Sequence, residues 1–140
     1  MNISKFTQKS VQAVQDLEKV AYEYGNQEVE QEHLLYALLT QEDSLILKLI
    51  EKMEINKDYF INTVKKALDA KVKVSGGDLR FGQYLNKSLV NAENEAKAMG
   101  DEYVSVEHLF LSLLTQPSPS MKKIFNEFGI TRERFLQALS

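Results

Sequence analysis

Two histidines, His33 and His108, are the residues of this sequence best suited to proton transfer or metal binding at neutral pH. Each directly follows a glutamate, Glu32 or Glu107, so neither begins the HExxH motif of a zinc protease. The sequence has no cysteine, and one histidine per half would need distant carboxylates to complete a zinc site. Each histidine stands near an expected helix start, where it can make a local hydrogen bond. We therefore assign both a structural role and predict no metal site.

Nucleotide chemistry would require glycines whose backbone N–H groups converge on phosphate, followed by lysine and a hydroxyl residue at a helix start. The adjacent pair Gly76 and Gly77 is followed by Asp78, so it indicates a flexible turn instead. No nucleophile, base and orienting residue cluster at a recognisable spacing. The sequence predicts that this chain is not an enzyme and binds no cofactor itself.

Two acidic residues, Asp101 and Glu107, flank Tyr103 and Val104 at one expected turn. Carboxylates around exposed apolar side chains are complementary to the basic, hydrophobic segments of an unfolded polypeptide. The turn is therefore a candidate polypeptide-binding surface.

A second candidate surface lies on the helix expected over residues 82–99. Its neighbouring strip carries Tyr84, Asn91 and Glu95 and continues to His108 on the next helix. The stripe expected to face the core consists of Phe81, Leu85, Leu89, Ala92, Ala96 and Met99. We predict that the strip, rather than the stripe, meets a bound polypeptide.

An internal repeat positions all of these residues. Shifting the chain by 75 aligns residues 6–65 with 81–140 without a gap and gives 16 identities, including Gly25/Gly100, Glu32/Glu107 and His33/His108. An apolar register kept over this length indicates two copies of one structural unit.

Apolar residues recur at spacings of three and four along each copy, which predicts helices and no sheet. Thr7, Asn56, Ser105 and Thr131 are suited to N-caps, and Gly25, Gly100 and Gly129 to left-handed C-terminal caps. The expected helices span 7–24, 30–41, 44–53 and 57–70 in the first copy, and 82–99, 105–116, 118–128 and 131–140 in the second.

The predicted fold is all-α, with two tandem four-helix repeats packed as one pseudo-twofold domain over residues 1–140. Repeat one spans 6–70, a linker spans 71–80, and repeat two spans 81–140. A four-helix unit of this size has a marginal core alone, so we expect the two repeats to fold together.

Composition limits the partners. The net charge of −3 gives no basic surface for nucleic acid, and the longest apolar run, residues 34–39, is far shorter than a membrane span. No signal-peptide core is present near the start, and cysteine is absent. We expect a cytoplasmic protein that binds neither nucleic acid nor membrane.

The segments Glu32-His-Leu-Leu-Tyr-Ala-Leu-Leu39, Glu107-His-Leu-Phe-Leu-Ser-Leu-Leu114 and Gly100-Asp-Glu-Tyr-Val-Ser-Val-Glu-His108, with Lys5-Phe-Thr7, carry a family resemblance. Together with the repeat they resemble the amino-terminal domain of the Clp ATPases, above all of its bacterial disaggregase branch. The resemblance covers essentially the whole chain.

The resemblance implies a monomeric domain that precedes two ATP-binding rings of a hexameric parent and engages unfolded or aggregated polypeptide. Docking of an adaptor protein, as in protease-coupled Clp relatives, stays open. It also implies a chaperone role for Thr7, Asp101 and Glu107, although Thr7 is equally suited to capping a helix. Family members often carry leucines where Asn91 and Glu95 stand here, so a strongly apolar groove is not expected.

Overall fold

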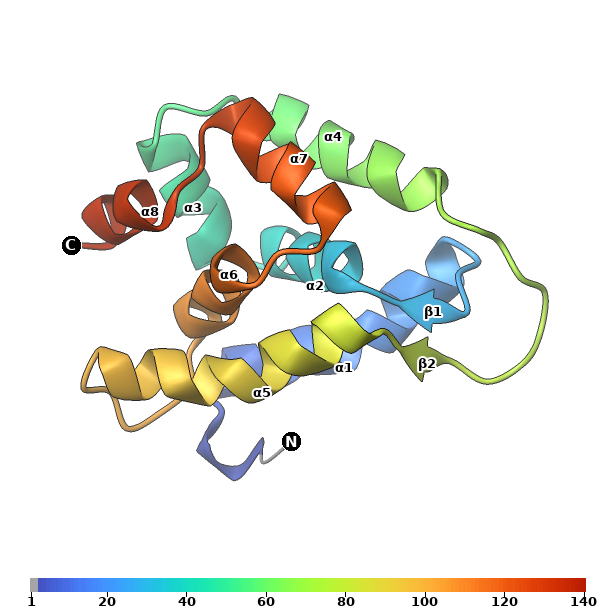
Figure 1. The fold of residues 1–140 in the computed structure, drawn as a ribbon, viewed down its shortest axis with the longest axis horizontal. Helices are drawn as coiled ribbons and strands as arrows, with labels where there is room; N and C mark the ends of the chain where they lie inside the picture. The colour runs from blue at the N-terminus through green and yellow to red at the C-terminus, as the bar shows by residue number, and fades with distance from the viewer. Residues whose placement is uncertain (1–2) are drawn as a thin grey trace.

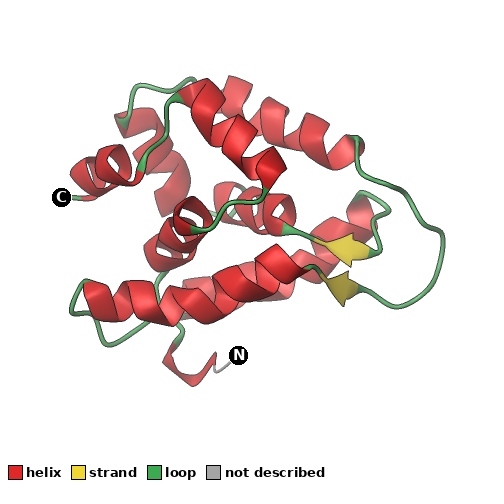
Figure 2. Cartoon of the chain, in the orientation of Figure 1, coloured by secondary structure: helices red, strands yellow, loops and turns green. Residues whose placement is uncertain are grey.

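A computed structural model describes residues 3–140, and helices dominate that part of the chain (Figures 1 and 2). Every predicted helix is present, and each of its ends lies within two residues of the expected position. The first repeat contains α1 (Gln8–Glu23), α2 (Gln31–Leu39), α3 (Leu45–Lys52) and α4 (Lys57–Asp69), and the second contains α5 (Gln83–Ala98), α6 (Val106–Thr115), α7 (Pro119–Phe128) and α8 (Arg132–Leu139). The all-α fold of two four-helix repeats is confirmed.

Helix ends follow the expected capping chemistry. The side chains of Thr7, Asn56 and Thr131 accept hydrogen bonds from backbone N–H groups in the first turns of α1, α4 and α8. Gly25, Gly100 and Gly129 adopt φ values of 69°, 72° and 63°, the left-handed region that favours glycine at helix ends.

Two short strands that the sequence analysis did not predict join the repeats. Strand β1 (Glu28–Val29) pairs in parallel with β2 (Arg80–Phe81), so Val29 lies opposite Phe81. An isolated parallel bridge joins Phe6 to Val104. Adding 75 to the number of Phe6 gives Phe81, and subtracting 75 from Val104 gives Val29, so the internal twofold relates the two pairings. The start of each repeat therefore pairs with a loop of the other.

The pairing at β2 corrects one part of the predicted buried stripe. Phe81 is 39% exposed because it lies in a short edge strand, and Met99 is 37% exposed because it ends α5. The four intervening members of that stripe are buried, as expected: Leu85, Leu89, Ala92 and Ala96.

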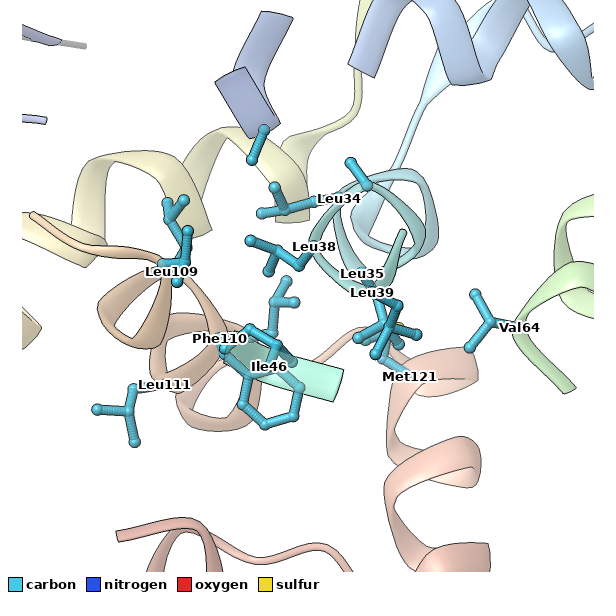
Figure 3. Packing of buried hydrophobic residues seen from close by; sticks show 14 of the residues in the cluster. Leu34, Leu35, Leu38, Leu39, Ile46, Val64, Leu109, Phe110, Leu111 and Met121 are labelled. Carbon is cyan, nitrogen blue, oxygen red and sulfur yellow. The ribbon is translucent and has the colours of Figure 1, made fainter. Parts of the chain in front are cut away.

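One apolar core spans both repeats. α2 and α6 lie at its centre, and most of their side chains are buried. Figure 3 shows Leu34 and Leu38 of α2 gathered with Leu109 and Phe110 of α6, while Ile46 and Met121 join from α3 and α7. Since both repeats supply this core, removing either would expose the central helix of the other.

No helix within residues 3–140 combines the length and apolarity needed to cross a bilayer.

Candidate polypeptide-binding site

The loop of residues 100–105 joins α5 to α6 and holds the predicted acidic turn. Oδ2 of Asp101 lies 2.8 Å from Nε2 of His108, and Nδ1 of His108 accepts a 2.8 Å hydrogen bond from the Ser105 N–H. Because Nδ1 is an acceptor, the neutral ring carries its proton on Nε2 and donates it to Asp101. His108 thus anchors both ends of the loop, the structural role that the sequence predicts for it.

Thr7 lies beside this loop because of the pairing between the repeats. Its backbone N–H donates to the carbonyl of Val104 at 3.0 Å, and the Val104 N–H donates to the carbonyl of Lys5 at 2.8 Å. The Thr7 hydroxyl accepts from the Ser10 N–H and donates to the Ser10 hydroxyl. Its capping role is therefore present in the structure, and it stands next to the acidic turn.

Glu107 occupies the first turn of α6 and is half-buried. Within residues 3–140 its carboxylate makes no ion pair and no hydrogen bond. Tyr103 is 55% exposed, whereas Val104 is buried. The structure thus places Thr7 against the loop that holds Asp101 and exposed Tyr103, with Glu107 in the helix turn that follows, and polypeptide binding there stays a prediction.

The residues of the second predicted strip do not form one surface, because two of them are accessible and two are buried. Asn91 lines a shallow groove of about 450 Å³ together with Asn86, Val90 and Gln116, and Val90 is 60% exposed. Tyr84 is exposed in the first turn of α5, about 21 Å along the helix from its C-terminal end. Both side chains are accessible, but Tyr84 is remote from the acidic turn.

The prediction that Glu95 and His108 belong to an open binding surface is wrong, because both side chains are buried. Oε1 of Glu95 lies 2.8 Å from Nη2 of Arg132 in α8, and the Thr115 hydroxyl donates to the same carboxylate. Burial pushes the pKa of Glu95 upward, but the bonds from Arg132 and Thr115 outweigh burial and hold the pKa below its usual value. Periodicity along α5 could not reveal a partner supplied by α8.

Comparison with known proteins now decides the family. The model of the Clp repeat (R) N-terminal domain matches residues 5–139. The chain belongs to this family. It is also 39% identical to chaperone protein ClpB of Nitratidesulfovibrio vulgaris and 40% identical to that of Clostridium tetani. Each match covers 99% of this chain and 17% of the relative, so the chain spans about a sixth of those relatives' length.

Solved structures share the fold. The Hsp104 N-terminal domain from Candida albicans superposes with a TM-score of 0.83 at 22% identity, over 98% of this chain and 91% of that chain. The ClpV N-domain in a structure described as its complex with a VipB peptide gives a TM-score of 0.71 at 21% identity, over 97% and 89%.

This Clp N-terminal domain also contains a copy of the anchored loop in repeat one. Nδ1 of His33 accepts the Glu30 N–H at 2.9 Å, and Nε2 lies 3.0 Å from Oδ1 of Asn26. Asn26 occupies the position of Asp101, so an amide replaces the carboxylate. Burial, followed by the charge of nearby Lys71, lowers the pKa of His33 to about 4.

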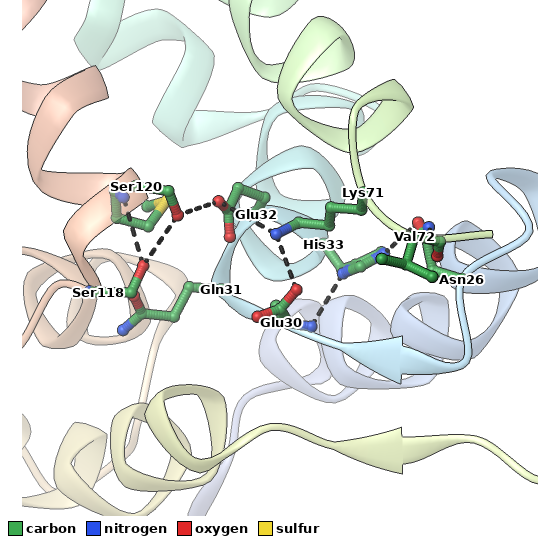
Figure 4. A network of polar contacts seen from close by, with 10 residues as sticks. Asn26, Glu30, Gln31, Glu32, His33, Lys71, Val72, Ser118 and Ser120 are labelled. Atoms are coloured by element: carbon green, nitrogen blue, oxygen red, sulfur yellow. Dashed lines mark hydrogen bonds and ion pairs between the residues drawn. The ribbon is translucent and has the colours of Figure 1, made fainter. Parts of the chain in front are cut away.

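The repeat-one copy of the Clp N-terminal domain site is filled by the chain itself (Figure 4). Nζ of Lys71, from the linker, lies 2.8 Å from Oε2 of Glu30 and 3.4 Å from Oε2 of Glu32. Ser120 of α7 donates a further hydrogen bond to Glu32 at 2.6 Å. Glu32 is the counterpart of Glu107, yet it is only 1% exposed. The sequence repeat aligned these glutamates but carried no signal that Lys71 would cover one of them.

Among residues 3–140, no three His, Asp or Glu side chains are grouped as metal ligands would be.

Proposed function

We propose that this Clp N-terminal domain binds unfolded or aggregated polypeptide and presents it to the ATP-driven rings of a larger, hexameric, ClpB-like disaggregase in the cytoplasm. The observation that carries the proposal is that Thr7 is bonded to the loop that carries Asp101 and the exposed Tyr103, and that this loop leads directly into the helix turn with Glu107. A free carboxylate and an exposed aromatic ring in one loop region offer charge and apolar contact to a bound segment. ATP would bind to other parts of the parent, and this chain would act as a monomeric binding module without catalysis.

The relatives support this reading, because those with about 40% identity are named chaperone protein ClpB. Their length is about six times that of this chain, which leaves room for ATP-binding domains outside it. The shallow, partly polar site suits weak binding, since cargo must be released to the next domain.

Adaptor docking is the alternative. A ClpV N-domain with this fold is described in complex with a VipB peptide, and another domain with this fold comes from ClpD, a chaperone associated with a caseinolytic protease. The same surface could therefore hold one defined segment of one adaptor rather than many unfolded clients.

NMR titration with a permanently unfolded client protein tests the proposal. We expect dissociation constants that are micromolar or weaker, about −8 kcal/mol or less favourable, and shifts centred on residues 100–107. The combined change Asp101→Ala and Glu107→Ala should weaken binding, whereas Glu133→Ala, an exposed acidic residue in α8, should not. Shifts elsewhere with unchanged affinity in the double variant would favour adaptor docking.

A further inference from the structure

Within residues 3–140, one copy of the anchored loop is covered by a chain segment and the other is not. We call Gly25, Asn26, Glu30 and Glu32 the filled site, because residues 71–74 of the linker lie on it. Their counterparts at +75 are Gly100, Asp101, Ser105 and Glu107, which we call the open site. Both copies have the same histidine anchor and the same left-handed glycine at the start of the loop.

The linker is held at the filled site through its backbone and its lysines. The Val74 N–H donates to the carbonyl of Gly25 at 2.9 Å, and Nδ2 of Asn26 donates to the carbonyl of Val72 at 3.1 Å. Lys71 reaches Glu30 and Glu32, while Lys73 donates to the carbonyl of Tyr24 at the end of α1 at 2.7 Å. The two valines stay exposed, at 80% for Val72 and 42% for Val74. The linker is therefore held at the filled site by backbone contacts and by its cations, and not by its two valine side chains.

The open site has the same histidine-anchored loop, but Ser105 stands where the filled site has Glu30, the closer partner of Lys71, so Glu107 is the remaining carboxylate for a cation. Glu107 has no ion-pair or hydrogen-bond partner within residues 3–140, unlike Glu32. Asp101 accepts hydrogen bonds but cannot donate one to a backbone carbonyl as Asn26 does. Exposed Glu102 adds a negative charge, and the neighbouring segments carry two exposed cations, Lys97 in the last turn of α5 and Lys5 across the Phe6–Val104 bridge.

From these two copies we infer that the open site binds an extended polypeptide segment in which lysine or arginine alternates with apolar residues, as the linker does at the filled site. A cationic side chain pairs with Glu107 as Lys71 pairs with Glu32, and a backbone N–H donates to the carbonyl of Gly100 as Val74 does to Gly25. The linker is thus an internal copy of the ligand. The inference rests on the proposed function and names the class of segment that the site selects.

The linker's own sequence provides the probe. A capped heptapeptide, Lys-Val-Lys-Val-Ser-Gly-Gly, reproduces residues 71–77, and a partner peptide with both lysines changed to glutamine removes the charge. Each is titrated into the ¹⁵N-labelled 140-residue chain. The lysine peptide should shift amides of residues 100–107 and bind about threefold to tenfold more tightly than the glutamine peptide.

Variants separate charge recognition from folding. Glu107→Gln should lower affinity for the lysine peptide about threefold to tenfold, and Glu133→Gln, which removes the same charge from exposed α8, should leave it unchanged. Equal affinity of the two peptides, no shifts, or shifts confined to residues 25–33 would each overturn the inference, the last because the peptide would then be displacing the linker.

An unfolded client run in parallel separates the two claims. If the client binds wild type and Glu107→Gln equally, the inference fails and the proposed function stands. If the lysine peptide binds the open site but no unfolded client binds, the proposed function fails instead.

Discussion

Oδ1 of Asn26 lies 3.0 Å from Nε2 of His33, which puts an amide where the second repeat has a carboxylate. Since Nδ1 of His33 accepts the Glu30 N–H, the neutral ring donates from Nε2 to that amide oxygen. A second proton on Nδ1 would break the bond to the helix start. The buried ring is therefore held neutral by its geometry as well as by burial.

Acid should destabilise the domain through His33. Its pKa is about 4 in the folded chain, because burial and then the charge of Lys71 disfavour the cation, against 6.5 when unfolded. Between those values the unfolded chain binds more protons, so the free energy of unfolding should fall as pH drops from 6.5 to 4, by roughly 3 kcal/mol. Urea unfolding across this range measures the fall, and NMR titration of the His33 ring identifies its source.

Asn26→Asp is the matched comparison for that experiment. The new carboxylate favours the charged ring, so His33 should titrate at a higher pH in this variant than in the unchanged chain. A His33 ring that titrates near 6.5 in the unchanged chain would contradict the prediction.

Lys71 should contribute more to the free energy of unfolding than an ordinary surface lysine does. Its side chain is 16% exposed and pairs with Glu32, whose side chain is 2% exposed, so Lys71→Met leaves a buried carboxylate without its countercharge. We expect a loss of about 2–3 kcal/mol in the free energy of unfolding. Lys48→Met, which breaks an exposed pair with Asp43, should cost about 0.5 kcal/mol or less. Similar losses in the two variants would show that the pair at the filled site is not specially buried.

Glu54 occupies a position at which the second repeat has a glycine. Its φ is 63°, the same as that of Gly129, its counterpart, and a side chain is strained in this region. Glu54→Gly should therefore raise the free energy of unfolding by about 1 kcal/mol. Gly129→Ala should lower it by a similar amount. Thermal unfolding compares both variants, and a destabilised Glu54→Gly chain would refute the argument.

The helices could be read from the sequence because their signals are local. Apolar spacing, N-caps such as Thr131 and glycines such as Gly129 depend on neighbours a few residues away, and each helix end lies within two residues of its prediction. The two-residue strands were missed because Val29 and Phe81 are far apart in sequence and their pairing depends on the twofold packing of the repeats.

The candidate site was predictable only in part, for the same reason. Asp101 and Glu107 are six residues apart, so the sequence alone assigns them to one loop and the helix turn that follows it. The exposure of Glu95 and Glu32 depends instead on Arg132 and Lys71, which come from distant segments. Exposure of a polar side chain on a helix is decided by the packing of the whole domain.

Cutting the linker should test whether the repeats fold as a unit. The pairings of Phe6 with Val104 and of Val29 with Phe81 cross between the repeats, so fragments 1–75 and 76–140 each lose both pairings and half of the core. Alone, neither fragment should show a cooperative thermal transition by circular dichroism. Mixed, they should regain helicity. A cooperative transition of fragment 1–75 alone would contradict the prediction.

Arg132 should stabilise the fold in a pH-dependent way through Glu95. At neutral pH the Glu95 carboxylate is charged and buried, so Arg132→Gln leaves it without its cation and should cost about 2–3 kcal/mol. Burial raises the pKa of Glu95, but Arg132 and Thr115 hold it below the unfolded value. The stabilisation is therefore present above the unfolded pKa and is lost as pH falls through the lower, folded pKa.

The variant and the unchanged chain should accordingly differ most at pH 7 and converge once Glu95 is protonated in both. Urea unfolding at pH 7 and in the acidic range checks this, with Arg80→Gln, an exposed arginine in β2, as the control for loss of one positive charge. Adding Glu95→Gln to Arg132→Gln should recover part of the loss at pH 7, because no buried charge then remains. If Arg132→Gln costs the same at both pH values, Arg132 stabilises α8 by packing and not through the carboxylate.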